Sequence, residues 1–177
     1  MKRLGLLRHA KSDWDDMALR DFDRGLNARG RKGAALMGAH IAGRATPFSL
    51  ALASPAVRVR RTLDASGLEI PVTFDDRIYL ADSTSLLEML SAVDDSHEAV
   101  LLAAHNPGLH DLALELISTR DHNPQLREIA AKFPTAAFAV LELDIARWAD
   151  IELGCGRLVH FARPRDFDPE LGPERSW

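Results

Sequence analysis

An apolar run at residues 4–7 (LGLL) stops abruptly at an arginine and a histidine, and this junction constrains the fold more than any other feature of the chain. The run has leucines on both faces of an extended segment, which is typical of a strand buried on both sides in a parallel sheet. Arg8 and His9 would then emerge at the carboxyl end of that strand. Open α/β sheets bind ligands at this edge, so the sequence predicts a ligand site there.

Two further apolar segments repeat the same pattern. Residues 48–53 (FSLALA) lead into a Ser-Pro step and a helix whose first turn carries Arg58, and residues 99–104 (AVLLAA) lead directly into His105. If the three segments are parallel strands of one sheet, their carboxyl ends lie at one edge. We therefore expect both arginines and both histidines to converge in one crevice.

The chemistry of these four side chains points to a phosphoryl group. Two arginines can bind phosphate oxygens through bidentate hydrogen bonds. One imidazole can act as a nucleophile that accepts the phosphoryl group, and a second can serve as a donor or acid. The pattern therefore favours phosphoryl transfer through histidine.

At these residues the sequence resembles the histidine phosphatase superfamily, which is named for an Arg-His-Gly signature, and within it the SixA-type phosphohistidine phosphatases. Residues 8–14 (RHAKSDW) are similar to that signature in the RHA form of this branch, residues 54–58 (SPAVR) to the second arginine motif, and residues 104–107 (AHNP) to the second histidine motif. The resemblance implies a phosphoglycerate-mutase-like α/β fold, a single three-layer domain with a mostly parallel central sheet flanked by helices.

The resemblance also implies catalytic roles for the four converging residues. Unprotonated His9 would attack phosphorus, and water would later hydrolyse the resulting phosphohistidine. Arg8 and Arg58 would hold the phosphoryl oxygens, and His105 would complete the site as a donor. The expected activity is a phosphatase that acts on a phosphorylated substrate.

Three neighbouring residues are candidates for substrate binding, namely Lys11, Ser12 and Asn106. Inorganic phosphate or sulfate should compete for the same pocket. Because the histidine itself carries the phosphoryl group, the resemblance implies no metal, and we expect no cofactor. No phosphate loop of the G-x-x-x-x-G-K-[ST] type occurs in the sequence.

The sequence departs from the family at two positions. Ala10 replaces the signature glycine, which leaves the loop workable if its φ is negative. The usual catalytic glutamate falls near residues 78–80 (IYL), where no carboxylate stands, and Asp82 and Glu88 are the nearest candidates. Without a placed acid, a basic alkoxide leaves poorly, whereas imidazole, with a pKa of about 6.5, can leave as a neutral molecule. We therefore expect a preference for phosphohistidine, in a protein or a small phosphoramidate.

Three alternatives remain open. The protein could hydrolyse small phosphate monoesters, or it could be a non-catalytic phosphate-binding module that lost its acid. A metal phosphoesterase could use His9, His105 and the aspartates of residues 13–23, although two nearby arginines would repel a dication. Those aspartates lack the spacing of a calcium loop, so residues 11–27 are interpreted as a solvated loop at the rim of the crevice.

Composition limits the domain organisation and the partners. The 177 residues, 46% of them hydrophobic, suit one domain at residues 1–163, followed by an irregular tail at 164–177 rich in proline, glycine and charge. A net charge of −4 argues against nucleic-acid binding. The apolar start is too short for a signal peptide or a membrane span, and the single Cys155 favours a reducing compartment. We therefore expect no membrane association and a cytoplasmic location.

Periodicity places the remaining elements. Helices are expected at 28–43, 56–66, 109–118 and, in a short form, 125–132. Another, at 85–95, would open with a capping box formed by Ser85 and Glu88. An edge strand is expected at 70–74, and strands at 138–143 and 156–162 should pair antiparallel.

Overall fold

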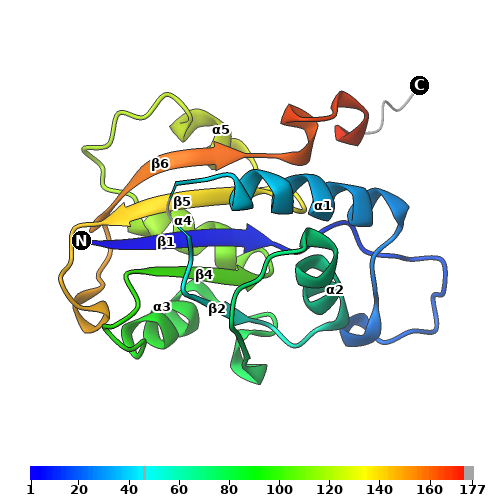
Figure 1. The fold of residues 1–177 in the computed structure, drawn as a ribbon, viewed down its shortest axis with the longest axis horizontal. Helices are drawn as coiled ribbons and strands as arrows, with labels where there is room; N and C mark the ends of the chain where they lie inside the picture. Colours follow the sequence, from blue (N-terminus) through cyan, green and yellow to red (C-terminus); the bar gives the residue numbers. More distant parts are fainter. Residues whose placement is uncertain (46, 174–177) are drawn as a thin grey trace.

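A six-stranded sheet runs through the middle of the protein in the computed structural model, which describes residues 1–45 and 47–173 (Figure 1). Its strands are β1 (Lys2–Arg8), β2 (Leu50–Ala53), β3 (Val72–Phe74), β4 (Ala99–Ala104), β5 (Phe138–Leu143) and β6 (Gly156–Ala162). They lie in the order β3-β2-β4-β1-β5-β6. The first four are parallel, whereas β5 and β6 are antiparallel to their neighbours. The mostly parallel sheet, the edge position of β3 and the antiparallel final pair were all predicted correctly.

The three apolar strands that precede the motifs end level with one another. Arg8, the last residue of β1, pairs with Ala104, the last residue of β4. Ala53 ends β2 opposite Ala103 of β4. Every residue of β4 is buried, as expected for a strand covered on both faces. The residues that follow β1, β2 and β4 therefore start from one edge of the sheet.

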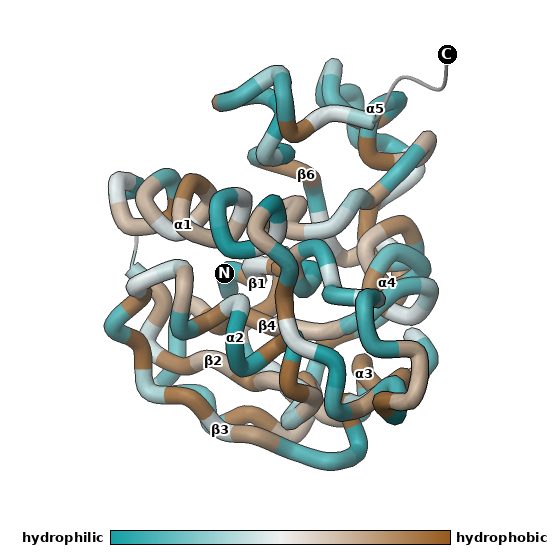
Figure 2. The backbone as a smooth tube through the Cα atoms, turned by 90° about the vertical axis from the view of Figure 1, so that its right-hand side faces the viewer, coloured by the Kyte–Doolittle hydropathy of each residue, from teal (hydrophilic) through white to brown (hydrophobic). Residues whose placement is uncertain are grey.

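Helices cover both faces of the sheet and complete three layers, which Figure 2 shows edge-on. The helices are α1 (Ala28–Ala42), α2 (Val57–Ser66), α3 (Ser83–Ser91), α4 (Gly108–Leu116) and α5 (Leu126–Ala131). Met37 of α1 packs in a cluster with Leu7 and Leu101 on one face. Leu109 of α4 packs with Leu4 on the other. Among the described residues, no helix is long and apolar enough to cross a membrane.

The predicted capping box of α3 was wrong. The helix begins at Ser83, and its N-cap is Asp82, whose carboxylate accepts a hydrogen bond from the backbone N–H of Ser85 at 2.8 Å. Aspartate is among the best N-cap residues because its oxygen satisfies an N–H left unpaired in the first turn. Ser85 is thus a residue of the first turn, and Glu88 does not form the box.

The carboxyl-terminal segment is more ordered than the sequence indicated. It forms two short 3-10 helices, Pro164–Asp166 and Pro169–Leu171. They are attached to α1 by an ion pair between Lys32 and Asp168 and by a 2.8 Å hydrogen bond from Arg29 to the carbonyl of Gly172. Residues 174–177 of the expected tail lie outside the described residues, and a boundary after residue 163 stays a prediction.

The first turn of α1 packs directly on the loop that follows His9. A Cβ on Gly30 would overlap the backbone carbonyl of Lys11, so only glycine permits this approach. Asn27 caps the helix by accepting a hydrogen bond from the Gly30 N–H at 2.8 Å. The position of the loop therefore depends on α1.

Replacing this glycine should shift the loop. We expect Gly30→Ala to destabilise the fold by about 1–3 kcal/mol, as overpacking typically does, and to lower Tm by roughly 2–4 °C per kcal/mol in a chain of this size. Gly33→Ala is the matched control, because its Cβ would make only ordinary contacts, with Pro164 at 3.4 Å and Ala136 at 3.8 Å. Alanine is also favoured over glycine in a helix interior. Equal Tm values for the two variants would contradict the close approach.

Candidate active site

The four residues predicted to converge lie together at the carboxyl edge of the sheet. Arg8 ends β1 and His9 follows it, Arg58 is the second residue of α2, and His105 follows β4. The rings of His9 and His105 have their centroids 5.2 Å apart. His9 is 9% exposed, Arg58 5% and His105 2%, so solvent contributes little to their electrostatics.

The ring of His9 is oriented by its neighbour in the chain. Its Nδ1 lies 2.8 Å from the carbonyl of Ala10, and since a carbonyl can only accept, Nδ1 carries the proton. Nε2 is then left with its lone pair. Burial lowers the pKa of His9 to about 4, and the charges of Arg8 and Arg58 contribute, although the hydrogen bond to Ala10 opposes the shift. The imidazole is therefore neutral at pH 7.

His105 is also neutral. Burial, followed by the charges of His9 and Arg58, lowers its pKa to about 3. Its Nε2 lies 2.7 Å from the hydroxyl of Ser54, and its buried Nδ1 has no partner within the part of the chain that the structure describes. If Ser54 donates to Nε2, Nδ1 carries a proton and can donate to an oxyanion.

Arg8 and Asn106 share an acceptor. Arg8 Nη1 and Asn106 Nδ2 both donate to the carbonyl of Phe133, at 3.0 and 2.8 Å. Burial and the charge of Arg58 lower the pKa of Arg8. Arg8 Nε and Asn106 Oδ1 are buried and have no partner among residues 1–45 and 47–173. The segment before β5 therefore fixes Arg8 while leaving polar groups for a ligand.

A carboxylate missed by the sequence analysis reaches Arg58. Asp21, in the 3-10 helix Asp21–Asp23, accepts from Arg58 Nη2 at 2.9 Å, and its backbone carbonyl accepts from Nη1 at 2.7 Å. The hydroxyl of Tyr79 donates to the same carboxylate at 2.5 Å. Asp21 is exposed, as expected for this loop, with 46% of its side chain accessible, but its pairing with Arg58 was not predicted. Its partners lie 37 and 58 positions away, so no local pattern marked it.

The environment of Asp21 keeps it ionised. Burial raises the pKa of this carboxyl, but the hydrogen bonds from Tyr79 and Arg58 outweigh burial and hold the pKa below its usual range. Burial, and then the hydrogen bond to Asp21, raises the pKa of the Tyr79 hydroxyl. Asp21 is therefore a proton acceptor at neutral pH, and Tyr79 keeps its proton.

Thr62 is a second residue that the sequence analysis missed. Its hydroxyl accepts from the backbone N–H of Ala10 at 2.8 Å and donates to the carbonyl of Arg58 at 2.7 Å. It thus connects the histidine loop to the arginine helix. Ala10 is fully buried and is not among the residues of positive φ, so alanine suits the position of the signature glycine.

The other candidates occupy less central positions. Ser12 is buried and forms a backbone bridge with Leu26, and Lys11 lines an adjacent cavity. Asp82 is used as the cap of α3. Glu88 lines a different cavity beside His97, near the amino end of β4. Within the described residues, no group of three His, Cys, Asp or Glu side chains could hold a metal ion.

Comparisons with known proteins agree with the motifs and the fold. The model of the histidine phosphatase superfamily (branch 1) matches residues 4–81. An uncharacterized protein of Mycobacterium leprae is 35% identical over 164 residues, which cover 90% of this chain and all of that protein. An uncharacterized protein of Mycobacterium tuberculosis is 36% identical over 160 residues, with the same shares.

Solved structures extend the agreement to the whole fold. A proposed phosphohistidine phosphatase SixA from Nakamurella multipartitia has a TM-score of 0.82 at 29% identity, over 92% of this chain and 96% of that one. A proposed SixA from Agrobacterium tumefaciens has a TM-score of 0.75 at 31% identity, over 92% and 98%. The structure of SixA complexed with tungstate shares the fold, with a TM-score of 0.74 at 23% identity. With its motifs at one edge of this sheet, the chain belongs to the histidine phosphatase superfamily and to its SixA-type branch.

Proposed function

We propose that the protein is a metal-independent phosphatase that forms a phosphohistidine on His9 and hydrolyses phosphohistidine substrates. The observation that carries the proposal is the state of His9, which is neutral, has Nδ1 bound to the Ala10 carbonyl and feels the positive charges of Arg8 and Arg58. An imidazole in this state is a nucleophile without any further activation. The name phosphohistidine phosphatase borne by the similar SixA structures supports the same substrate class.

In the first step, the lone pair on Nε2 of His9 attacks phosphorus, and the leaving group departs with the bonding electrons. Arg8 and Arg58 neutralise the charge on the phosphoryl oxygens. Both terminal nitrogens of Arg58 are bonded to Asp21 in this structure, so a phosphoryl oxygen would replace Asp21 there. Tungstate in the SixA complex is an oxyanion like phosphate, which supports an anion site of this kind.

In the second step, water attacks the phosphohistidine and releases phosphate. An ionised carboxylate can accept the proton of that water, and Asp21 is the carboxylate at the site. The same ionisation makes Asp21 a poor acid for the first step. Imidazole does not need such an acid, since it can leave as a neutral molecule once its other nitrogen is protonated. The state of Asp21 therefore favours phosphohistidine over alkyl phosphates.

Asp21 is also the observation that favours the alternative of a small-monoester phosphatase. A phosphoryl dianion beside Arg58 would compete for the guanidinium and weaken the ion pair that keeps Asp21 ionised. Asp21 could then take up a proton and deliver it to an alkoxide. The two functions differ in how strongly turnover depends on the leaving group.

A comparison of substrates tests the proposed function. We expect kcat/KM for a phosphohistidine peptide to exceed that for an alkyl phosphate by about 10² or more, because a missing acid costs roughly 10²–10⁴ in rate. Aryl phosphates, whose leaving groups are less basic, should be intermediate. Asp21→Asn should reduce turnover of all substrates by similar factors. If the alkyl phosphate is the better substrate and Asp21→Asn selectively abolishes its hydrolysis, the protein is a monoester phosphatase.

The proton states of the histidines give an independent prediction. Because burial lowers the pKa of His9 to about 4 and that of His105 to about 3, neither ring should titrate between pH 5 and 9. Unfolded histidines have a pKa of about 6.5, so the unfolded state binds more protons between about pH 4 and 6.5, and stability should rise with pH there. The ring resonances of both histidines, followed by NMR as a function of pH, would give their titration midpoints. A midpoint near 6.5 for either ring would contradict it.

A further inference from the structure

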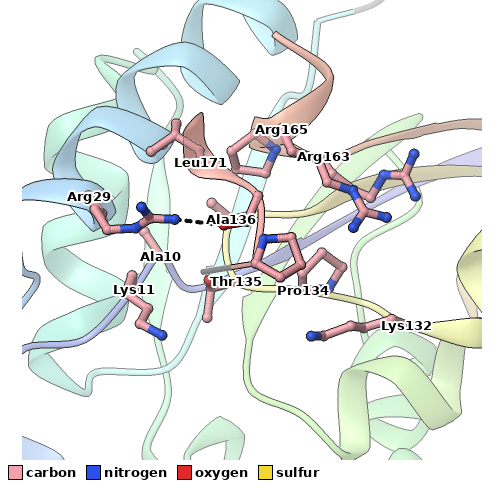
Figure 3. Close-up of a pocket in the computed structure, with 15 residues that line it drawn as sticks. Ala10, Lys11, Arg29, Lys132, Pro134, Thr135, Ala136, Arg163, Arg165 and Leu171 are labelled. Carbon is pink, nitrogen blue, oxygen red and sulfur yellow. Dashed lines mark hydrogen bonds between the residues drawn. The ribbon is translucent and has the colours of Figure 1, made fainter. Parts of the chain in front are cut away.

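A cavity of about 220 Å³ lies beside the histidine site, between α1, the segment before β5 and the carboxyl-terminal 3-10 helices (Figure 3). Five of its fifteen lining residues are basic, and among the described residues that line it none is acidic; the basic residues are Lys11, Arg29, Lys132, Arg163 and Arg165. At the average composition of the chain, fifteen residues would hold about two of each sign. We call this cavity the basic pocket.

Part of this positive charge is uncompensated. Arg163 pairs with Glu128 and Asp166 at 3.0 Å. In contrast, Lys132 and Arg165 form no ion pair with any described residue. In Figure 3, Lys11 and Arg29 lie on one side of Thr135 and Pro134, and Lys132 and Arg163 lie on the other. An anion bound between them would meet donors from several directions.

The basic pocket and the histidine site share a wall. The carbonyl of Phe133 accepts from Arg8 in the histidine site, while its neighbours Lys132 and Pro134 line the basic pocket. The next residues continue the wall, where the N–H of Ala136 donates to the carbonyl of His9 at 2.9 Å. Lys11 is two residues after His9, so their Cα atoms are at most about 7.6 Å apart.

We propose that the basic pocket binds a phosphate or carboxylate group, carried either by the substrate whose phosphoryl group reacts at His9 or by a free anion. Arginine and lysine donors recognise these oxyanions through charge-assisted hydrogen bonds. The cavity is large enough for one such group and its linkage. The substrate-borne form rests on the proposed function. In an extended phosphohistidine peptide, the Cα atom of a residue two positions from the histidine lies about 7 Å from that of the histidine.

Direct binding tests the pocket without any turnover. Inorganic phosphate titrated into ¹⁵N-labelled protein should shift the amide signals of Thr135 and Gly172, which line the basic pocket, as well as those around Ser54 in the histidine site. In Lys132→Glu, the phosphate affinity measured from the signals of Thr135 and Gly172 should fall by about tenfold, which corresponds to the loss of one charged hydrogen bond. The shifts around Ser54 should persist. No shift at Thr135 and Gly172 in the wild type would overturn the proposal.

Kinetics then distinguish the two sources of the anion. A phosphohistidine peptide with glutamate two residues away should have a KM about tenfold lower than the same peptide with glutamine, and Lys132→Glu should remove that difference. Turnover of phosphoramidate, which carries no second anion, should be unchanged. Arg120→Glu is the control, because Arg120 is exposed on the loop that bridges to the first residue of β6, at the opposite end of the sheet.

The outcomes separate this proposal from the proposed function. Phosphate shifts at Thr135 without any peptide discrimination would assign the pocket to a free anion. If the wild-type protein turns over no phosphohistidine substrate but phosphate still shifts the signals of Thr135 and Gly172, the proposed function is overturned while anion binding in the basic pocket is supported. The Tm values of Lys132→Glu and of the uncharged variant Lys132→Gln, compared with that of the wild type, show whether either substitution disturbs the fold. Equal effects of Lys132→Glu and Arg120→Glu on KM would overturn the substrate-borne form.

Discussion

The parallel pairing of β1 with β4 and of β4 with β2 is the constraint on which the site depends. Because these strands end level with one another, the residues that follow them, His9, Ser54 and His105, are delivered to one edge. The hydrogen bonds that orient the rings are made at the same junctions, where His9 donates to the carbonyl of Ala10 and the ring of His105 bonds to the hydroxyl of Ser54. A slip of one residue in either ladder would turn these side chains away from each other.

Placing the buried Arg58 and the partly buried Arg8 beside two buried histidines has an electrostatic consequence. Burial and the two positive charges hold both imidazoles neutral, which is the state that a nucleophile requires. The uncompensated charge would be costly in a low dielectric, and Asp21 offsets it by pairing with Arg58. A phosphoryl group can take over that compensation when it binds. Asp21 thus has two roles: it pairs with Arg58 in the unliganded site, and it is the proton acceptor in the proposed hydrolytic step.

Much of this arrangement could be predicted from the sequence, because apolar runs and the residues that end them are local signals. The bounds of β4, β5 and β6 and the convergence of Arg8, His9, Arg58 and His105 followed from such signals. The contacts of Asp21 and Tyr79 could not, since they join segments far apart in the chain. The cap of α3 was misplaced because Asp82, Ser83, Thr84 and Ser85 can all cap a helix, so residue type alone does not choose between them.

The most direct test of the account is to identify the atom that carries the phosphoryl group. Protein mixed with a phosphoramidate should be quenched in alkali within the first turnover, digested and analysed by mass spectrometry. We expect one phosphoryl group on the peptide that contains His9, stable in base and labile in acid, absent from His9→Ala and retained in His105→Ala. A label on His105, or turnover that persists in His9→Ala, would contradict the account.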